Sequence, residues 1–116
     1  KCMLPFNVDR PSVLAGDFLL EHSNIVQALT ARIVKEREKL IIKLNGLDGV
    51  KAWPSSTNFF LLKTPLSPSI AFRKLAEDGI LVRDVSSYPV CQELLRVTVG
   101  TSKENNHLFK AVVRLL

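Results

Sequence analysis

The N-terminal part of the chain carries apolar residues at helical spacing. Pro11 and Ser12 suit a helix start, because the fixed φ angle of proline fits the first helical turn. This helix is expected to run to about Glu21. Its short apolar face consists of Val13, Leu14, Phe18 and Leu19.

A second, longer helix follows almost at once. Ser23 or Asn24 can cap it, since short polar side chains accept hydrogen bonds from free N–H groups in the first turn. Gly46 and Gly49 end it, because glycine tolerates the left-handed conformation common at helix C-termini. The spacing therefore predicts a helix over 24–45, which is the longest element of the chain. Its apolar stripe consists of Ile25, Leu29, Ile33, Leu40 and Leu44.

Four short apolar segments have the length of strands. Three of them are residues 50–53, 80–83 and 94–99. The fourth, Asn58–Leu62, is almost wholly apolar, which predicts a strand buried on both faces.

Two further helices complete the pattern. One begins at Ser67 or Ser69 and stops at Gly79. The other is capped by Thr101 or Ser102, with Glu104 placed to favour the helix dipole. The element order predicts an α+β fold, with a small, mainly antiparallel sheet covered on one face by helices. Residues 1–10 are expected to form an interdomain connection, and residues 11–116 the domain itself.

Length and composition indicate a folded protein of one domain that does not span a membrane. The 116 residues suit one domain, and 47% hydrophobic with 23% charged residues is typical of a folded protein. No apolar run approaches the roughly 18 residues needed to cross a bilayer. The segment 1–9 does not resemble a secretory signal. A cytoplasmic location is expected, or a stroma-like one if a transit peptide has been removed.

The charge distribution and the spacing of cysteines and histidines argue against a nucleic-acid-binding protein and against a metal-binding protein. The net charge of +5 is spread along the chain, without the interleaved basic and aromatic residues that stack nucleic-acid bases. No nucleic-acid partner is therefore expected. Cys2 and Cys91 lie far apart, and neither has the spacing to His22 or His107 that a metal site requires. The two cysteines are interpreted as ordinary thiols, and no metal is expected.

Two motifs carry a family resemblance. The first is Asp78–Ser86, read DGILVRDVS, followed by Tyr88 and Pro89. The second is Leu95–Thr101, read LRVTVGT, followed by Glu104 and Asn105. In order and spacing they resemble the C-terminal small domain of histidinol-phosphate aminotransferases. Either motif alone would indicate only the wider class of fold-type I aminotransferases and decarboxylases. The chain also begins without Met, and is interpreted as a piece of a longer protein.

The resemblance implies three substrate-binding residues: Arg96, Arg83 and Asn58. Arg96 matches the arginine that binds the substrate's anionic group, and a planar guanidinium can meet two oxygens at once. Arg83 matches a second arginine associated with the substrate's phosphate, and Asn58 lies at the pocket edge.

Each of these residues also has a structural alternative. Arg96 could face solvent on an edge strand, or could pair with Asp84 or Glu93. Arg83 could pair with the neighbouring Asp84 at the surface. Asn58 could cap a strand, and Tyr88 belongs to a common type of loop.

The resemblance also implies an activity for the full-length parent. That activity is pyridoxal-phosphate-dependent transfer of an amino group between histidinol phosphate and 2-oxoglutarate (or glutamate) in histidine biosynthesis, by a homodimer. In the family, the cofactor lysine lies in the large domain, and no lysine here sits in a comparable motif. The chain alone is therefore predicted to be inactive, with no catalytic, cofactor-binding or metal-binding residue.

Two kinds of alternative stay open. One is the small domain of another fold-type I enzyme, such as a threonine-phosphate decarboxylase or an aromatic aminotransferase. The other is a non-catalytic interaction module. Such a module should bury Ile25, Leu29, Trp53 and Phe59, whereas a domain that docks on a large domain should expose an apolar patch.

Overall fold

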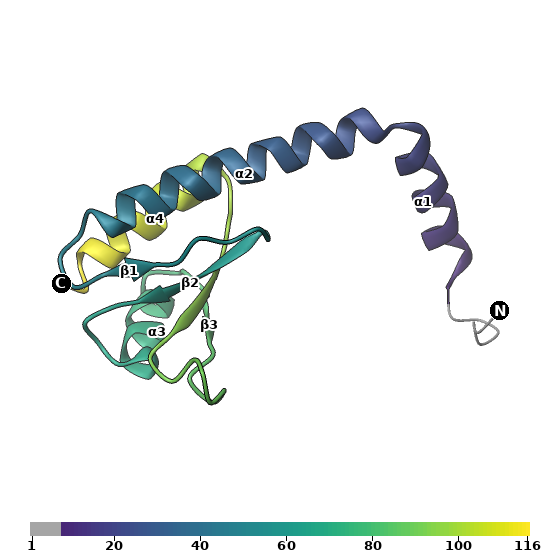
Figure 1. The fold of residues 1–116 in the computed structure, drawn as a ribbon. Coiled ribbons are helices and arrows are strands. Elements are labelled where there is room, and N and C mark those ends of the chain that lie inside the picture. Colours follow the sequence, from purple (N-terminus) through teal and green to yellow (C-terminus); the bar gives the residue numbers. More distant parts are fainter. Residues whose placement is uncertain (1–7) are drawn as a thin grey trace. The chain divides into compact units, whose positions relative to one another are not determined.

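The computed structural model describes residues 8–116 and divides the chain into two compact units. The first unit ends at Arg32, and the second runs from Ile33 to Leu116. The elements in chain order are α1 (Arg10–Glu21), α2 (Ser23–Asn45), β1 (Lys51–Ala52), β2 (Phe59–Lys63), α3 (Pro68–Glu77), β3 (Arg83–Asp84), β4 (Leu95–Thr98) and α4 (Ser102–Val113), as Figure 1 shows.

The first unit consists of α1 and the start of α2. Asp9 caps α1, where its carboxylate oxygen Oδ1 accepts a hydrogen bond of 2.7 Å from the backbone N–H of Ser12. This bond holds the pKa of Asp9 below its usual range. At the other end, the His22 ring stacks on Phe18, with 4.1 Å between centroids. The predicted helix is confirmed. The predicted connection over residues 1–10 lies mostly outside the described residues, and Arg10 already belongs to α1.

The second unit is built on a four-stranded sheet with the order β1-β2-β4-β3. Every neighbouring pair is antiparallel. The expected α+β class with a small antiparallel sheet is confirmed. The side chain of Asn45, at the end of α2, closes the free edge of β1: its amide donates to the carbonyl oxygen of Ala52 and accepts from the N–H of the same residue.

The helices cover one face of this sheet. Because successive side chains of a strand point to opposite faces, β2 and β4 each direct alternate residues toward the helices. In Figure 1, α4 runs beside the part of α2 that belongs to this unit. The residues that form the core include Leu40, Leu44, Phe60, Leu62, Leu75, Leu95, Val97, Leu108 and Val112.

Two sequence predictions about the strands were wrong in detail. Asn58–Leu62 was expected to be buried on both faces, but Phe59 and Leu61 are only half-buried. No helix of the second unit covers their face (Figure 1). The strand expected over 80–83 occupies Arg83–Asp84 instead. The N–H of Ile80 donates to the carbonyl oxygen of Leu75 at the C-terminus of α3. Ile80 is therefore hydrogen-bonded to the helix and not to the sheet.

The start of α4 is a complete capping box. The hydroxyl oxygen of Thr101 accepts from the N–H of Glu104, and the Glu104 carboxylate accepts from the N–H of Thr101 at 2.7 Å. These bonds satisfy N–H groups that a helix start leaves without partners. The sequence prediction of a cap at Thr101 with Glu104 in the first turn is confirmed.

We predict that Thr101→Ala lowers the free energy of unfolding by about 1 kcal/mol, because the helix loses its N-cap. Urea titration followed by far-ultraviolet circular dichroism measures the change. Ser102→Ala is the matched control, since this exposed neighbour is one position beyond the cap. Equal stability of the two variants would contradict the role given to Thr101.

The capping box also predicts that the free energy of unfolding depends on pH. The N–H and hydroxyl of Thr101 donate to the Glu104 carboxylate, and hold its pKa below the usual 4.5. A lowered folded-state pKa stabilises the fold above the unfolded value, and this contribution is lost as the pH falls through the folded value. Glu104→Gln should therefore be less stable than the unmodified chain near pH 7, with a difference that shrinks at acidic pH. A difference independent of pH would refute this.

Candidate functional site

Arg83 and Arg96 lie directly opposite each other, on the face of the sheet that no helix of the second unit covers (Figure 1). Arg96 is in β4, an interior strand between β2 and β3, and its register partner in β3 is Arg83. Residues paired across an antiparallel ladder point to the same face. The edge-strand alternative for Arg96 is therefore wrong, because the arginine reaches this face from the middle of the sheet.

Arg96 has an aromatic neighbour but, among residues 8–116, no carboxylate partner. Its guanidinium carbon lies 5.0 Å from the centroid of the Phe59 ring, within the range of a cation–π contact. Its Nε atom is buried and has no hydrogen-bond partner within residues 8–116. A buried donor without an acceptor is uncommon and is destabilising by itself.

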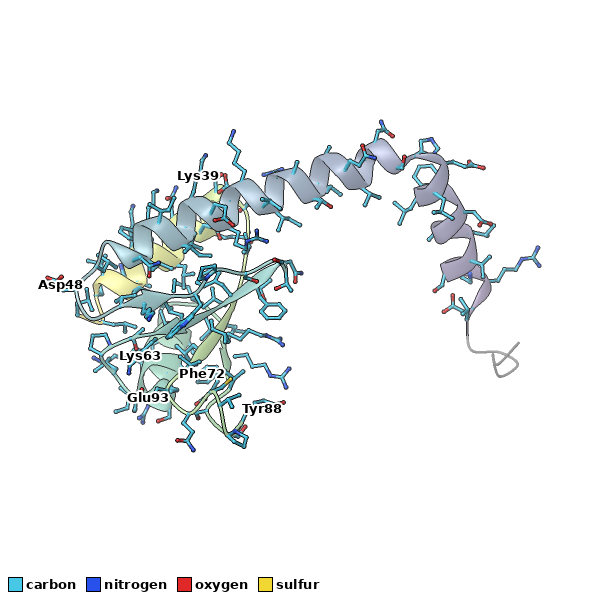
Figure 2. The ribbon with its side chains drawn as sticks, viewed as in Figure 1. Lys39, Asp48, Lys63, Phe72, Tyr88 and Glu93 are labelled. Atoms are coloured by element: carbon cyan, nitrogen blue, oxygen red, sulfur yellow. The ribbon has the colours of Figure 1, made fainter. Side chains whose placement is uncertain are left out.

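The two internal partners considered for Arg96 are engaged elsewhere. The Oδ1 atom of Asp84 accepts a hydrogen bond of 2.8 Å from the N–H of Ser86. Glu93 forms an ion pair with Lys63 (Figure 2). In the part of the chain that the structure describes, neither carboxylate pairs with Arg96 or with Arg83. Two guanidinium groups thus stand opposite each other without a counter-charge, an arrangement that an anion would stabilise.

Asn58 occupies a different place from the two arginines. It is exposed in the bend before β2, where its carbonyl oxygen accepts from the N–H of Val99 at 2.9 Å. Its backbone thus extends the ladder between β2 and β4. Arg96 is three residues before Val99, so the structure brings Asn58 to the end of the sheet but not to the arginine pair.

Two lysines lie on the same face and were not predicted from the sequence as part of the site. Lys51 and Lys63 are register partners in β1 and β2. Lys51 lies over the Trp53 ring at 5.0 Å, and Lys63 holds Glu93. We call the set of Lys51, Lys63, Arg83 and Arg96 the basic face. The alternation of charged with apolar residues along the strands was the signal that could have revealed it.

A shallow depression of about 1100 Å³ lies next to the basic face but includes neither arginine. It runs between residues 79–82 and the first half of α4, and its apolar residues include Ile80 and Val99. The carboxylate there belongs to Glu104, which is committed to the capping box. The basic face is therefore the better candidate for anion recognition.

The described residues do not fit covalent attachment of a pyridoxal-phosphate cofactor. A Schiff-base lysine needs an environment that favours its neutral amine, such as burial in an apolar pocket. Every lysine between residues 8 and 116 is exposed or half-exposed. In the same range, no three His, Cys, Asp or Glu residues form a metal-binding group, and no helix is long and apolar enough to span a bilayer. Cys91 is a half-buried free thiol, whereas Cys2 lies outside the described residues.

Comparison with known proteins places this geometry in a family. The family model for aminotransferase class I and II matches residues 4–112. The histidinol-phosphate aminotransferase of Aquifex aeolicus is 37% identical over 97% of this chain, and that of Ruminiclostridium cellulolyticum 36% identical over 90%. The matched regions are 32% and 29% of those proteins, so the chain spans about a third of their length.

Solved structures share the fold. The histidinol-phosphate aminotransferase of Clostridium acetobutylicum superposes with a TM-score of 0.87 at 20% identity, over 98% of this chain and 35% of that one. The L-threonine-O-3-phosphate decarboxylase of Porphyromonas gingivalis gives 0.80 at 26% identity, over 93% and 34%. With sequence and fold in agreement, the chain belongs to the class I and II aminotransferase family.

Proposed function

We propose that this chain is the substrate-binding small domain of a pyridoxal-phosphate-dependent aminotransferase, acting on histidinol phosphate and 2-oxoglutarate in histidine biosynthesis. The observation that carries the proposal is the pair of Arg83 and Arg96, opposite each other and without a carboxylate partner among residues 8–116. The names of the similar curated proteins support the choice of histidinol phosphate as a substrate.

The two arginines suit the anionic groups of both substrates. Histidinol phosphate carries a phosphate and no carboxylate, whereas 2-oxoglutarate carries two carboxylates. A guanidinium group binds either anion through parallel charge-assisted hydrogen bonds. A bound anion would also relieve the repulsion between the two opposed cations. One face could thus serve both half-reactions, because each requires recognition of an anion at the same end of the substrate.

The covalent chemistry belongs to parts of the parent enzyme beyond this chain. Pyridoxal phosphate, when bound, supplies an electron sink for the bonds of the substrate's amino-bearing carbon. We place its lysine outside this chain, because the described lysines are unsuited to a Schiff base. Binding the substrate and orienting its anionic end are the roles left to Arg83, Arg96 and, at the end of the sheet, Asn58.

Exposed apolar residues favour a domain that docks on the rest of a longer protein. Within the first unit, Ile25 and Leu29 are exposed, with 54% of Leu29 accessible. Trp53 and Phe59 are only half-buried. A free interaction module would be expected to bury these side chains. Further exposed apolar residues in the first unit are Val8, Val13, Leu14, Phe18, Leu19, Leu20 and Val26.

A threonine-phosphate decarboxylase is the second candidate. The observation in its favour is the similarity of the fold to a decarboxylase of that name. Its substrate also carries a phosphate, so the basic face suits both enzymes. The curated relatives at higher identity bear the aminotransferase name, which favours the first candidate. The homodimer and the cytoplasmic location stay predictions.

We predict that Arg96→Ala in the full-length parent raises KM for both substrates by roughly ten- to a hundred-fold, because a charge-assisted contact is lost. Steady-state kinetics with histidinol phosphate and with 2-oxoglutarate measure the change. Arg73→Ala is the matched control, since this exposed arginine lies on α3 and away from the basic face. Unchanged kinetics for Arg96→Ala would exclude the proposed site.

We also predict that the isolated chain does not hold pyridoxal phosphate covalently. After addition of the cofactor and reduction with borohydride, peptide mapping should find no lysine that is labelled stoichiometrically. The full-length parent, treated in the same way, should carry one label on a lysine beyond this chain. Saturable labelling of a single lysine within the chain would show that the cofactor site had been misplaced.

A further inference from the structure

The ring of Phe59 supports the guanidinium group of Arg96. The two residues come from adjacent strands, and the guanidinium carbon is 5.0 Å from the ring centroid. The Nε atom of Arg96 is buried, whereas the residue as a whole is half-buried. An anion therefore cannot reach Nε and must approach through the two terminal Nη atoms. The orientation of the guanidinium plane then decides whether both nitrogens meet the anion.

The backbone of Phe59 is itself held in place by Thr57. The hydroxyl of Thr57 donates to the carbonyl oxygen of Phe59 at 3.0 Å, and its oxygen lies 3.3 Å from the N–H of the same residue. Ser55 adds a contact to this hydroxyl and accepts from the N–H of Thr57. These local bonds fix the bend at the start of β2, from which the ring projects.

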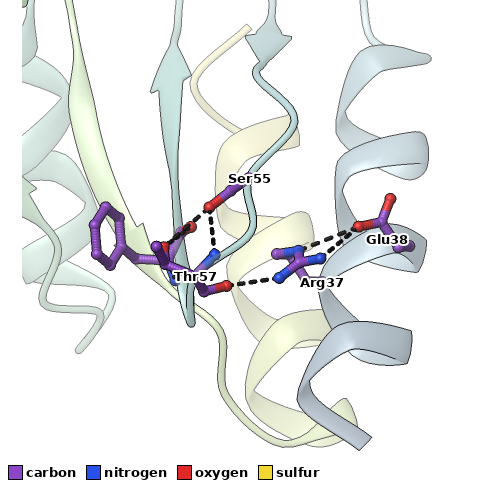
Figure 3. Close-up of polar contacts among 5 residues, drawn as sticks. Arg37, Glu38, Ser55 and Thr57 are labelled. Carbon is purple, nitrogen blue, oxygen red and sulfur yellow. Dashed lines mark hydrogen bonds and ion pairs between the residues drawn. The ribbon is translucent and has the colours of Figure 1, made fainter. Parts of the chain in front are cut away.

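A buried arginine anchors this bend to α2. Arg37 is only 6% exposed, and its Nη1 atom donates to the carbonyl oxygen of Thr57 at 2.7 Å. Its Nε and Nη2 atoms donate to Glu38, so the guanidinium has partners on both sides (Figure 3). Charge-assisted hydrogen bonds of this kind are stronger than neutral ones. The series Arg37, Thr57, Phe59 thus runs from the helix to the ring under Arg96.

We propose that Phe59 is a positioning residue, which orients the guanidinium of Arg96 for the substrate's anion, and that Arg37 and Thr57 fix its place. The inference rests on the proposed function. A free arginine side chain loses rotamer freedom when it binds a ligand, and this loss weakens binding. The Phe59 ring restricts the side chain beforehand. Phe59 does not touch the anion and acts only through Arg96.

Phe59→Leu in the full-length parent tests this role. We expect KM for histidinol phosphate and for 2-oxoglutarate to rise about three- to thirty-fold, the range of a cation–π contact, with a smaller change in kcat. Phe59→Tyr should restore KM, because it keeps an aromatic face. Thr57→Val, which removes the hydroxyl, should raise KM by a smaller factor. Thermal unfolding should show the same midpoint for the Leu and Tyr variants.

A double-mutant cycle separates this inference from the proposed function. In a parent that already carries Arg96→Ala, Phe59→Leu should have no further effect on kcat/KM, since the group it orients is gone. An equal effect in both backgrounds would overturn the inference. An unchanged KM in Phe59→Leu would also overturn it, and so would a KM in Phe59→Tyr that stays as high as in Phe59→Leu. In either case the proposed function would stand, provided that Arg96→Ala raises KM. Unchanged kinetics in Arg96→Ala would overturn both.

Discussion

The rest of this structure depends on one constraint: the helices of the second unit cover only one face of the sheet. Alternate residues of β4 point to opposite sides, so Leu95 and Val97 enter the core while Arg96 emerges on the other face. Burial of the two apolar residues fixes the register of the strand. A slip of one residue would place Arg96 in the core and expose both apolar neighbours. The position of the arginine is therefore secured by the packing of the residues beside it.

The basic face shows the electrostatic consequence of this arrangement. Lys63 has a carboxylate partner in Glu93, but exposed pairs of this kind contribute little to stability. Arg83 and Arg96 have no such partner among the described residues. A fold optimised only for stability would supply a counter-charge here. Its absence is understandable if the counter-charge arrives with a ligand, which connects the geometry with the proposed anion binding.

The fold alone does not choose the reaction. An aminotransferase and a decarboxylase both superpose on this chain, so the arrangement of helices and strands is compatible with different reactions. Both of these neighbours are named for substrates that carry a phosphate. Under the proposed function, the basic face would bind the phosphate that such substrates share, and groups beyond this chain would determine the reaction.

The sequence by itself determined the elements whose causes are local. The cap at Thr101 and Glu104 depends on residues within one helical turn and was confirmed, and α2 ends at Asn45, directly before Gly46. The left-handed backbone expected of the glycines after α2 is found at Gly49 and not at Gly46. The motifs around Arg83 and Arg96 also sufficed to identify the family. The strand predicted over residues 80–83 was wrong, because the end of α3 takes the N–H of Ile80.

Only the tertiary structure decided which residues share a face and what they touch. Strand pairing set Arg83 opposite Arg96, brought Lys51 and Lys63 to the same side, and left Asn58 at the end of the sheet. Phe59 was expected in the core, yet it lies beneath a guanidinium group 37 residues further along the chain. Such contacts depend on register and on which face the helices cover. Both are set by the packing of the whole unit, so no local pattern in the sequence contains them.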